Sequence, residues 1–348
     1  MNTGLEMPSS ERSPYTAPIV DSLAVRVVVD SRHEAVLPKE SHAHVKIEHV
    51  GDIPDRIMHT LAAEWGLSLH LTSETGGAKA EYLLDFGWTP DVLIRNLDLL
   101  GIDLARLKAL ILSHGHLDHF GGLVGFLEQH RKSMRDDLSL YVGGEDTFLP
   151  RWAENTNPDD PKIMPWGELR KDTLLSHRVV PSCCETPHVF DDAVTTGYIP
   201  RHSFEKSTSH TFIAKPTIEN CPDHFTPEER SGKLMVDDHP EEHGIAYLVR
   251  DKGLVVISSC GHIGIVNTVH AALAATGVDR LHAVLGGFHL VASKQDYIDH
   301  TVDALLELNP DIVIPMHCTG PAFIDTMRRR APEKLVVGNL GSRYTFGT

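Results

Sequence analysis

Three histidines and one aspartate lie within six residues, at His114, His116, Asp118 and His119. An apolar run leads directly into this cluster, so we expect it to follow a buried strand. In an extended segment the first two histidines would point to the same side, and a turn near Leu117 would carry the other two residues toward a second position. Imidazole and carboxylate groups bind zinc, manganese and iron, which activate water for hydrolysis. The spacing therefore predicts a metal centre with two neighbouring positions.

Asp85 ends another predicted strand, within the sequence LLDFG. A carboxylate at this place can accept a hydrogen bond from a ligand imidazole, or from the backbone beside it, and so orient the ligand. Taken alone, Asp85 is more simply explained as a turn residue at a strand end. Gly121 and Gly122 follow the histidine cluster and allow the backbone to pass close to the site before a helix begins.

Strand and helix patterns supply the framework for these residues. A β-branched run and a Gly-Gly turn predict strands and a hairpin in the first half of the chain. After residue 244 strands and helices alternate, which is typical of a layered α/β core. The expected strands are 25–29, 67–72, 80–86, 107–112, 245–250, 254–258, 283–285 and 312–315, and the expected helices are about 92–100, 123–130, 263–276 and 296–308.

The domain organisation follows from the same patterns. Residues 1–20 carry Pro, Ser and Thr without periodicity, and they are predicted to form a mobile N-terminal tail. Residues 21–348 are expected to form one domain. A long polar stretch at about 128–243, with weak strand signals around 138–142 and 194–199, is predicted to be a loop-rich insertion that covers the site.

Two further clusters are interpreted as surface features. His42, His44 and His49 lie in a polar, irregular stretch, and no carboxylate or cysteine joins them at the compact spacing of a metal site. The basic run at 328–330 is interpreted as the solvated end of a helix.

Charge and composition exclude several classes of partner. The 48 acidic and 32 basic residues give a net charge of -16, which opposes binding to nucleic acid or to an anionic membrane surface. No window approaches the ~20 apolar residues of a membrane span, and the N-terminus lacks the apolar stretch of a signal peptide. The five cysteines follow no disulfide-scaffold spacing. We therefore expect a cytoplasmic protein with a small-molecule substrate, and a homo-oligomer is compatible with the sequence.

Five motifs together resemble the metallo-β-lactamase superfamily. They are SHGHLDHFGGL, the preceding LLDFG, and the later SSCGHIGIVN, LGGFH and PMHCTG. The similarity runs from about Val25 to the C-terminus. It is strongest to the branch that is similar to the dihydropterin-ribofuranosylaminobenzene-phosphate synthases. The resemblance implies an α/β (α+β) fold, a four-layer αββα sandwich with metals at one edge of its two sheets.

The resemblance also implies ligands for two divalent metal ions. His114 and His116 would bind the first metal, and Asp118 and His119 the second. His317, in PMHCTG, would close the second position. The residues themselves agree, because the apolar strand before His317 delivers it at its C-terminal end, where ligands collect in such sheets. We expect zinc, with manganese or iron as alternatives.

Cys260 departs from the commonest pattern of the superfamily, which has a metal-bridging aspartate at this position. A cysteine thiolate binds zinc but suits harder ions poorly. The usual third histidine of the first metal is not clearly present before the strand at 245, where the branch tends to carry acids such as those at 237–238. We therefore assign His262 to complete this site. His239 and Cys260 remain alternative ligands.

Three more residues are candidates for contact with the substrate. His289, in LGGFH, follows a strand and a glycine pair, and we assign it to the substrate or leaving group with general-acid chemistry. A metal ligand is the second interpretation. Arg201 and His202 lie in a stretch similar to the branch, where Arg201 could hold a phosphate or carboxylate. Placement on the surface is equally compatible with that stretch.

Together these features predict a metallo-β-lactamase-fold, metal-dependent hydrolase. Its catalytic residues would be Asp118 and His289, and its substrate a small ester, phosphoester, lactone or related compound. Three alternatives remain open: synthase-like activity on a pterin-related phosphate, an iron-dependent redox enzyme on the same fold, and a non-catalytic metal-dependent binding protein.

Overall fold

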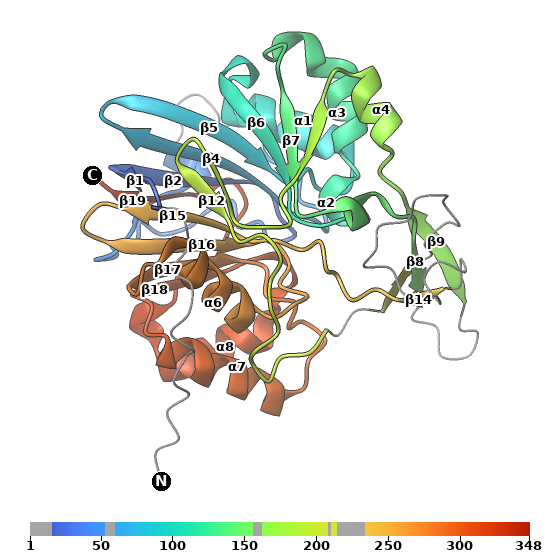
Figure 1. Cartoon of the computed structure of the whole chain (residues 1–348). Helices are drawn as coiled ribbons and strands as arrows, with labels where there is room; N and C mark the ends of the chain where they lie inside the picture. Colours follow the sequence, from blue (N-terminus) through green and yellow to red (C-terminus); the bar gives the residue numbers. More distant parts are fainter. Residues whose placement is uncertain (1–15, 53–59, 156–161, 208–209, 214–233) are drawn as a thin grey trace.

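Two large β-sheets face each other, and helices cover both outer faces (Figure 1). The computed structural model describes residues 16–52, 60–155, 162–207, 210–213 and 234–348. Hydrophobic side chains of both sheets form the central core, with Leu69 and Ile111 on one side and Tyr247 and Leu285 on the other. The expected four-layer αββα sandwich is confirmed.

The first sheet has eight strands and contains the strand that leads to the histidine cluster. Its hairpin between β4 (Ser68–Thr75) and β5 (Ala78–Leu84) turns at Gly76 and Gly77, whose φ angles of 58° and 83° favour glycine. This confirms the predicted hairpin. In spatial order the strands are β10 (Val180–Cys183), β7 (Ser139–Val142), β6 (Leu107–Leu112), β5 (Ala78–Leu84), β4 (Ser68–Thr75), β2 (Ser22–Val29), β19 (Arg343–Gly347) and β3 (Lys46–Glu48).

The second sheet has seven strands, and three of them run parallel toward the same edge. These three are β16 (Gly253–Ser258), β17 (Leu281–Gly286) and β18 (Ile312–Pro315). The others are β11 (His188–Phe190), β12 (Ala193–Thr195), β15 (Ile245–Val249) and β1 (Ile19–Val20). Since β1 pairs with β15, the last residues of the expected tail belong to this sheet, whereas residues 1–15 lie outside the described ranges.

Helices on each outer face bury an apolar stripe against the neighbouring sheet. The first sheet is covered by α1 (Pro90–Leu100), α3 (Leu123–His130) and α4 (Lys171–Ser176). The second is covered by α6 (Ile265–Thr276), α7 (Gln295–Glu307) and α8 (Pro321–Arg330). None of the helices in the described ranges combines the length and apolarity that a bilayer span requires.

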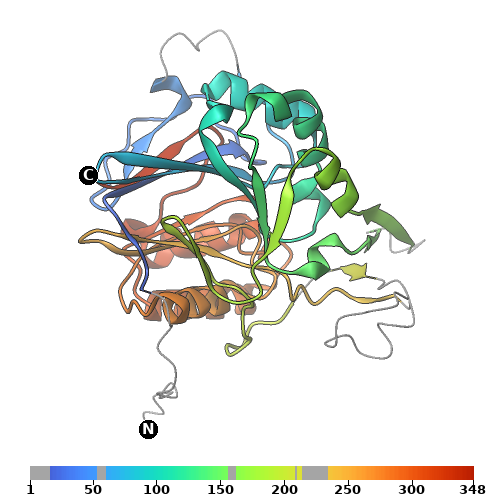
Figure 2. The same ribbon diagram turned by 45° about the horizontal axis from the view of Figure 1, so that its top comes forward.

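The stretch at about 128–243 is more structured than a loop-rich insertion. It supplies β7 and β10 to the first sheet and β11 and β12 to the second. It also forms a small third sheet that projects beside the edge of the sandwich (Figure 2). The strands of this sheet are β14 (Met235–Val236), β13 (Thr211–Ile213), β8 (Arg151–Glu154) and β9 (Ile163–Gly167). The weak strand signals around 138–142 and 194–199 overlap β7 and β12, whereas the strands of the third sheet carry too short a pattern to be distinguished from loops.

Candidate metal centre

The predicted metal ligands gather at the edge where parallel strands of both sheets end. β6 ends at Leu112, and the short helix α2 (Leu117–Phe120) begins five residues later. This turn packs the His114 ring 4.6 Å from the His116 ring and 4.3 Å from the His119 ring, measured between centroids. All three imidazoles are buried.

Asp118, His119 and His317 form one part of the cluster. The Oδ2 atom of Asp118 lies 3.3 Å from Nε2 of His317 and 3.7 Å from Nε2 of His119. His317 lies two residues after the end of β18 and has a φ of 48°, a left-handed backbone that turns its side chain back to the edge. The structure thus brings together the three residues expected at the second metal position.

His262 and His239 both lie beside the first pair of histidines. The His262 ring is 4.9 Å from His114 and 4.6 Å from His116, and His239 stacks on it at 4.0 Å. His239 is also 4.6 Å from His116. His114, His116 and His262 offer nitrogen atoms within 4.8 Å of one another, as do His116, His239 and the carboxylate of Asp237. Both alternatives for completing the first position are therefore close at hand.

Buried atoms without hydrogen bonds show that this cluster suits a cation. An unsatisfied buried polar atom costs about 1–3 kcal/mol, so a protein seldom gathers several of them. Within the described residues, buried side-chain atoms of this cluster that form no hydrogen bond are His114 Nε2, Asp118 Oδ1, His119 Nε2 and both ring nitrogens of His239, His262 and His317. Imidazole and carboxylate atoms in such numbers fit zinc or a similar divalent ion.

Asp85 and Ser113 orient two of the imidazoles. Asp85 lies just after β5 and accepts hydrogen bonds from Nδ1 of His119 at 2.6 Å and from the Ser113 backbone N–H and hydroxyl, both at 2.8 Å. The Ser113 oxygen is in turn 2.9 Å from Nδ1 of His114. In both rings Nδ1 is thereby occupied, which leaves Nε2 for a metal.

A buried ionic network supports the other side of the cluster. Arg151 is fully buried, donates to Asp237 at 2.7 Å and also bonds Glu241. Glu241 accepts from the N–H of Gly115, within the HxH motif, and Asp237 Oδ2 is 3.7 Å from Nε2 of His116. Arg151 and Glu241 were not identified from the sequence, because they are 90 residues apart and belong to no compact motif.

Glu242 holds the turn that carries His262. Its carboxylate accepts three backbone N–H groups, from Gly261 at 2.8 Å, His262 at 3.0 Å and Ile263 at 2.7 Å. The neighbouring His243 has a different role, since its nitrogens bond the Leu112 carbonyl and the Thr195 hydroxyl. It has no free nitrogen for a metal.

A thiol pair lies beside the ligand cluster. The Sγ atom of Cys260 is 3.2 Å from that of Cys318 and 3.4 Å from Nδ1 of His289. Candidate ligand atoms of Cys260, His114 and His119 all lie within 4.8 Å of one another. The His289 ring is 4.0 Å from that of His262, and the residue is only partly buried. His289 therefore lies between the cluster and solvent.

Arg201 and His202 are placed outside the cluster. Both are exposed; Arg201 bonds the carbonyl oxygen of Asp238, and the His202 backbone bonds Asn267. The structure gives neither side chain a contact with the predicted metal ligands.

Burial sets the protonation of the cluster. Burial and the neighbouring histidines lower the pKa of His114 and His262 well below the usual range, and burial lowers the pKa of His116 to about 4. Burial alone would raise the pKa of Asp118, but His119 and His317 outweigh it and hold that pKa well below its ordinary value. At neutral pH these residues are neutral imidazoles and a carboxylate, the states that bind metals.

Three tryptophans surround the cluster. The Trp166 ring is 4.6 Å from His116, and the Trp65 ring is 5.0 Å from His317. Trp88 lies 6.2 Å from Trp166, and Trp65 and Trp88 are 43% and 37% exposed. They offer flat apolar surface next to the candidate ligands.

Comparison with known proteins agrees with this geometry. The sequence model of the metallo-beta-lactamase superfamily matches residues 75–135. A solved structure described as a metal-dependent hydrolase of the beta-lactamase superfamily superimposes with a TM-score of 0.66 at 21% identity, covering 92% of this chain and 98% of that one. The likeness establishes the fold, and the resemblance seen in the sequence motifs is confirmed.

Two proteins of Methanocaldococcus jannaschii are similar over most of their length. One is 7,8-dihydropterin-6-methyl-4-(beta-D-ribofuranosyl)-aminobenzene-5'-phosphate synthase, 28% identical over 289 residues, which are 78% of this chain and 90% of that protein. The other is an uncharacterized protein, 28% identical over 241 residues, which are 68% of this chain and 78% of that protein.

Proposed function

Because this chain has the metallo-β-lactamase fold, we propose that it is a metal-dependent hydrolase that acts on a small-molecule substrate with two divalent metal ions, zinc in the first instance. The convergence of buried ligand atoms without hydrogen bonds carries this proposal. His114, His116 and His262 would hold the first ion, with His239 as the alternative third ligand. Asp118, His119 and His317 would hold the second.

The residues of the site divide the chemistry among them. Two bound cations supply Lewis-acid stabilisation of negative charge and lower the pKa of water. Asp118, held as a carboxylate between His119 and His317, orients the attacking water. His289, on the open side of the cluster beside His262, would protonate the leaving group. Trp65, with nearly half of its surface exposed beside His317, packs against apolar parts of the substrate.

A synthase-like activity on a pterin-related phosphate is the second candidate. The named relative with this activity supports it, as do the tryptophans, because aromatic side chains stack on planar rings. The net charge of -16 favours a small substrate over nucleic acid or a membrane surface. Four described cysteines are free, which supports a reducing compartment such as the cytoplasm.

Metal analysis combined with a substrate screen tests the proposal. The purified protein is expected to contain close to two zinc or manganese ions and to hydrolyse at least one phosphoester, lactone, thioester or amide. His114→Ala should lose metal and activity, whereas His300→Ala, on the exposed face of α7, should keep both. Bound iron with oxygen consumption would support the redox alternative. Stoichiometric metal without turnover would support a binding protein, and full activity in His114→Ala would refute the metal centre.

A further inference from the structure

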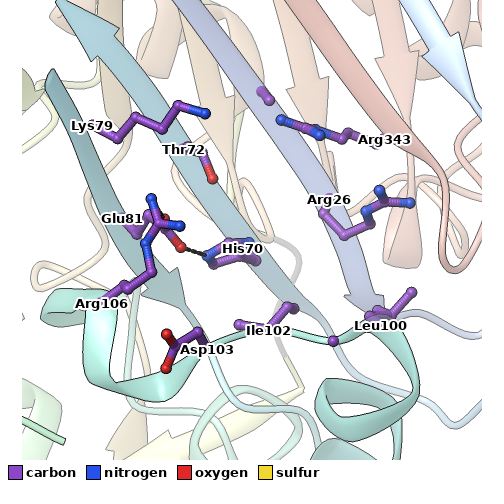
Figure 3. A pocket seen from close by; sticks show the side chains of 12 residues that line it. Arg26, His70, Thr72, Lys79, Glu81, Leu100, Ile102, Asp103, Arg106 and Arg343 are labelled. Carbon is purple, nitrogen blue, oxygen red and sulfur yellow. Dashed lines mark hydrogen bonds and ion pairs between the residues drawn. The ribbon is translucent and has the colours of Figure 1, made fainter. Parts of the chain in front are cut away.

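A pocket separate from the metal centre lies on the outer face of the first sheet, beyond the C-terminal end of α1 (Figure 3). Side chains of β2, β4, β5 and β19 line it, together with the segment after α1, and it encloses about 240 Å³. Lys79 and Glu81 come from the first half of β5, whereas Asp85 and the metal centre lie at the opposite end of that strand. The pocket shares no lining residue with the metal centre.

The pocket concentrates positive charge in an acidic protein. Four cationic side chains line it, against two carboxylates, Glu81 and Asp103. The whole chain carries a charge of -16, so a cavity lined by more cationic than anionic side chains differs in sign from the protein as a whole. In Figure 3 the charged ends of Lys79 and Arg343 point toward each other from opposite sides of the pocket. The cationic residues are Arg26, Lys79, Arg106 and Arg343.

Arg26 and Arg343 are a pair of like charges that Glu48 offsets only from a longer distance. They lie directly opposite each other on the antiparallel strands β2 and β19, a position in which like charges are destabilising. Burial and the charge of Arg343 lower the pKa of Arg26 to about 10. Among the described residues no carboxylate lies within 4 Å of either guanidinium, although Glu48 opposes Arg343 on β3. Arg26 donates one hydrogen bond, to the Gly341 carbonyl at 2.8 Å.

Glu81 is already engaged by other groups. One of its oxygens pairs with Arg106 at 2.7 Å, and the other lies 3.1 Å from Nε2 of His70. The hydrogen bond from His70 lowers the pKa of Glu81, so it is a carboxylate at neutral pH. It fixes Arg106 at the rim of the pocket without neutralising Arg26 or Arg343.

We propose that this pocket binds a small phosphate-bearing metabolite. A dianionic phosphate would neutralise Arg26 and Arg343 together, and guanidinium groups match phosphate oxygens in a planar fork. Lys79 supplies a third cation, and the Thr72 hydroxyl a neutral donor. Leu100 and Ile102, on the side of α1, give the carbon part of the ligand an apolar wall.

Calorimetry with phenylphosphonate, which resists hydrolysis, tests this site on the full-length, metal-loaded protein. Arg343→Gln and Lys79→Gln should each weaken binding about tenfold, because each removes a charge-assisted contact. Arg328→Gln, which removes one charge from the exposed end of α8, should leave binding unchanged. His114→Ala should lose metal yet still bind the phosphonate.

Stability measurements separate a binding effect from a folding effect. Because Arg343→Gln relieves the repulsion with Arg26, its melting temperature without ligand should equal or exceed that of the wild type, and phenylphosphonate should no longer raise it. Unchanged phosphonate affinity in both Arg343→Gln and Lys79→Gln would overturn the proposal. Loss of binding in His114→Ala would do so as well, because it would assign the phosphonate to the metal centre.

Discussion

Asp85 shows how one carboxylate can determine which atom of a histidine is offered to a metal. It accepts from Nδ1 of His119 and from two groups of Ser113, so all its close contacts are with donors. An asparagine at this position would have an NH2 group in place of one carboxylate oxygen, and this group would face a donor instead of accepting from it. The side chain must therefore be an ionised acid, not merely a polar group of the same size.

We expect Asp85→Asn to lower metal affinity by about 10–100-fold while the protein remains folded, because the His119 imidazole would lose its orientation. Metal titration followed by equilibrium dialysis measures the effect. Asp251→Asn is the matched control, since Asp251 is an exposed turn residue with a φ of 58°, which asparagine tolerates. Equal metal affinities in the two variants would show that Asp85 acts only as a turn residue.

Cys260 and His262 are expected to differ in importance. Cys260→Ser should keep most activity, because Cys260 contacts the Cys318 thiol and His289 at the side of the cluster. His262→Ala should lose activity and metal, because its ring packs against those of both His114 and His116. The opposite order would make Cys260 a thiolate ligand and favour zinc. If Cys260→Ser and His262→Ala both stay active, His239 becomes the candidate for the third ligand of the first position.

At this scale the sequence predicted which candidate ligands lie together but not the residues that support them. His114, His116, Asp118 and His119 stand together in one motif, so their proximity needed no knowledge of the fold. Arg151 bonds Asp237 and Glu241, which are 86 and 90 positions away along the chain, and no local sequence pattern predicts such contacts. The tryptophans likewise come from separate segments, which the fold alone brings together.

Turns, rather than regular strands, carry the side chains of the centre. The turn at 261–263 lies between β16 and α6 and depends on one buried carboxylate, that of Glu242. Glycine at 264 has a φ of 105°, so this turn also needs a residue without a side chain. The position of His262 is therefore a property of the turn as a unit.

We expect Glu242→Ala to destabilise the protein by about 1–3 kcal/mol, because three buried N–H groups would lose their acceptor. Metal occupancy should fall with it, as His262 shifts. Glu242→Gln should recover part of both losses, since its carbonyl oxygen still accepts. Urea unfolding and metal analysis on the three proteins check this. Wild-type stability in Glu242→Ala would show that the turn does not depend on the Glu242 carboxylate.

The elements of the C-terminal half were predictable from the sequence and those of the small sheet were not. β15 to β18 are buried and apolar. β15 and β16 form a hairpin, and helices α6 and α7 separate β16, β17 and β18, so the pattern is long and regular. β13 has three residues and β14 has two, and β13 pairs with both β14 and β8, which lie far from it along the chain. Such short strands form because neighbouring strands pair with them, and their own sequences do not predict them.

For the whole molecule, the metal-free centre should make stability depend on pH. Burial lowers the pKa of four imidazoles, those of His114, His116, His239 and His262. In the unfolded chain they titrate near about 6.5. Below that pH the unfolded chain binds more protons than the folded one, so the free energy of unfolding falls as pH falls. His119 and His317, whose pKa values are raised by Asp118 and other neighbouring groups, oppose this trend at the upper end of the window, because the folded chain already holds their protons while the unfolded chain is still binding them.

We expect urea unfolding of the metal-free protein to show a clear loss of stability between pH 6.5 and pH 5, at most about 1.4 kcal/mol per group and pH unit. His262→Gln should reduce this slope, because it removes one of the four imidazoles. A flat profile over this window would mean that the histidines are solvated in the metal-free state. Bound zinc should steepen the profile, because protons compete with it for the same nitrogens.

The order of the ligands along the chain has a consequence for synthesis. Chains emerge from the ribosome N-terminus first, so His114 to His119 leave it long before β18 and His317 exist. A cation captured at that time would meet only two of the three ligands proposed for each position, all from the segment that follows β6 of the first sheet. The complete centre can form only when translation has passed the last strand of the second sheet. A chain that stopped before residue 312 would therefore keep the HxHxDH motif and yet be unable to close its second metal position.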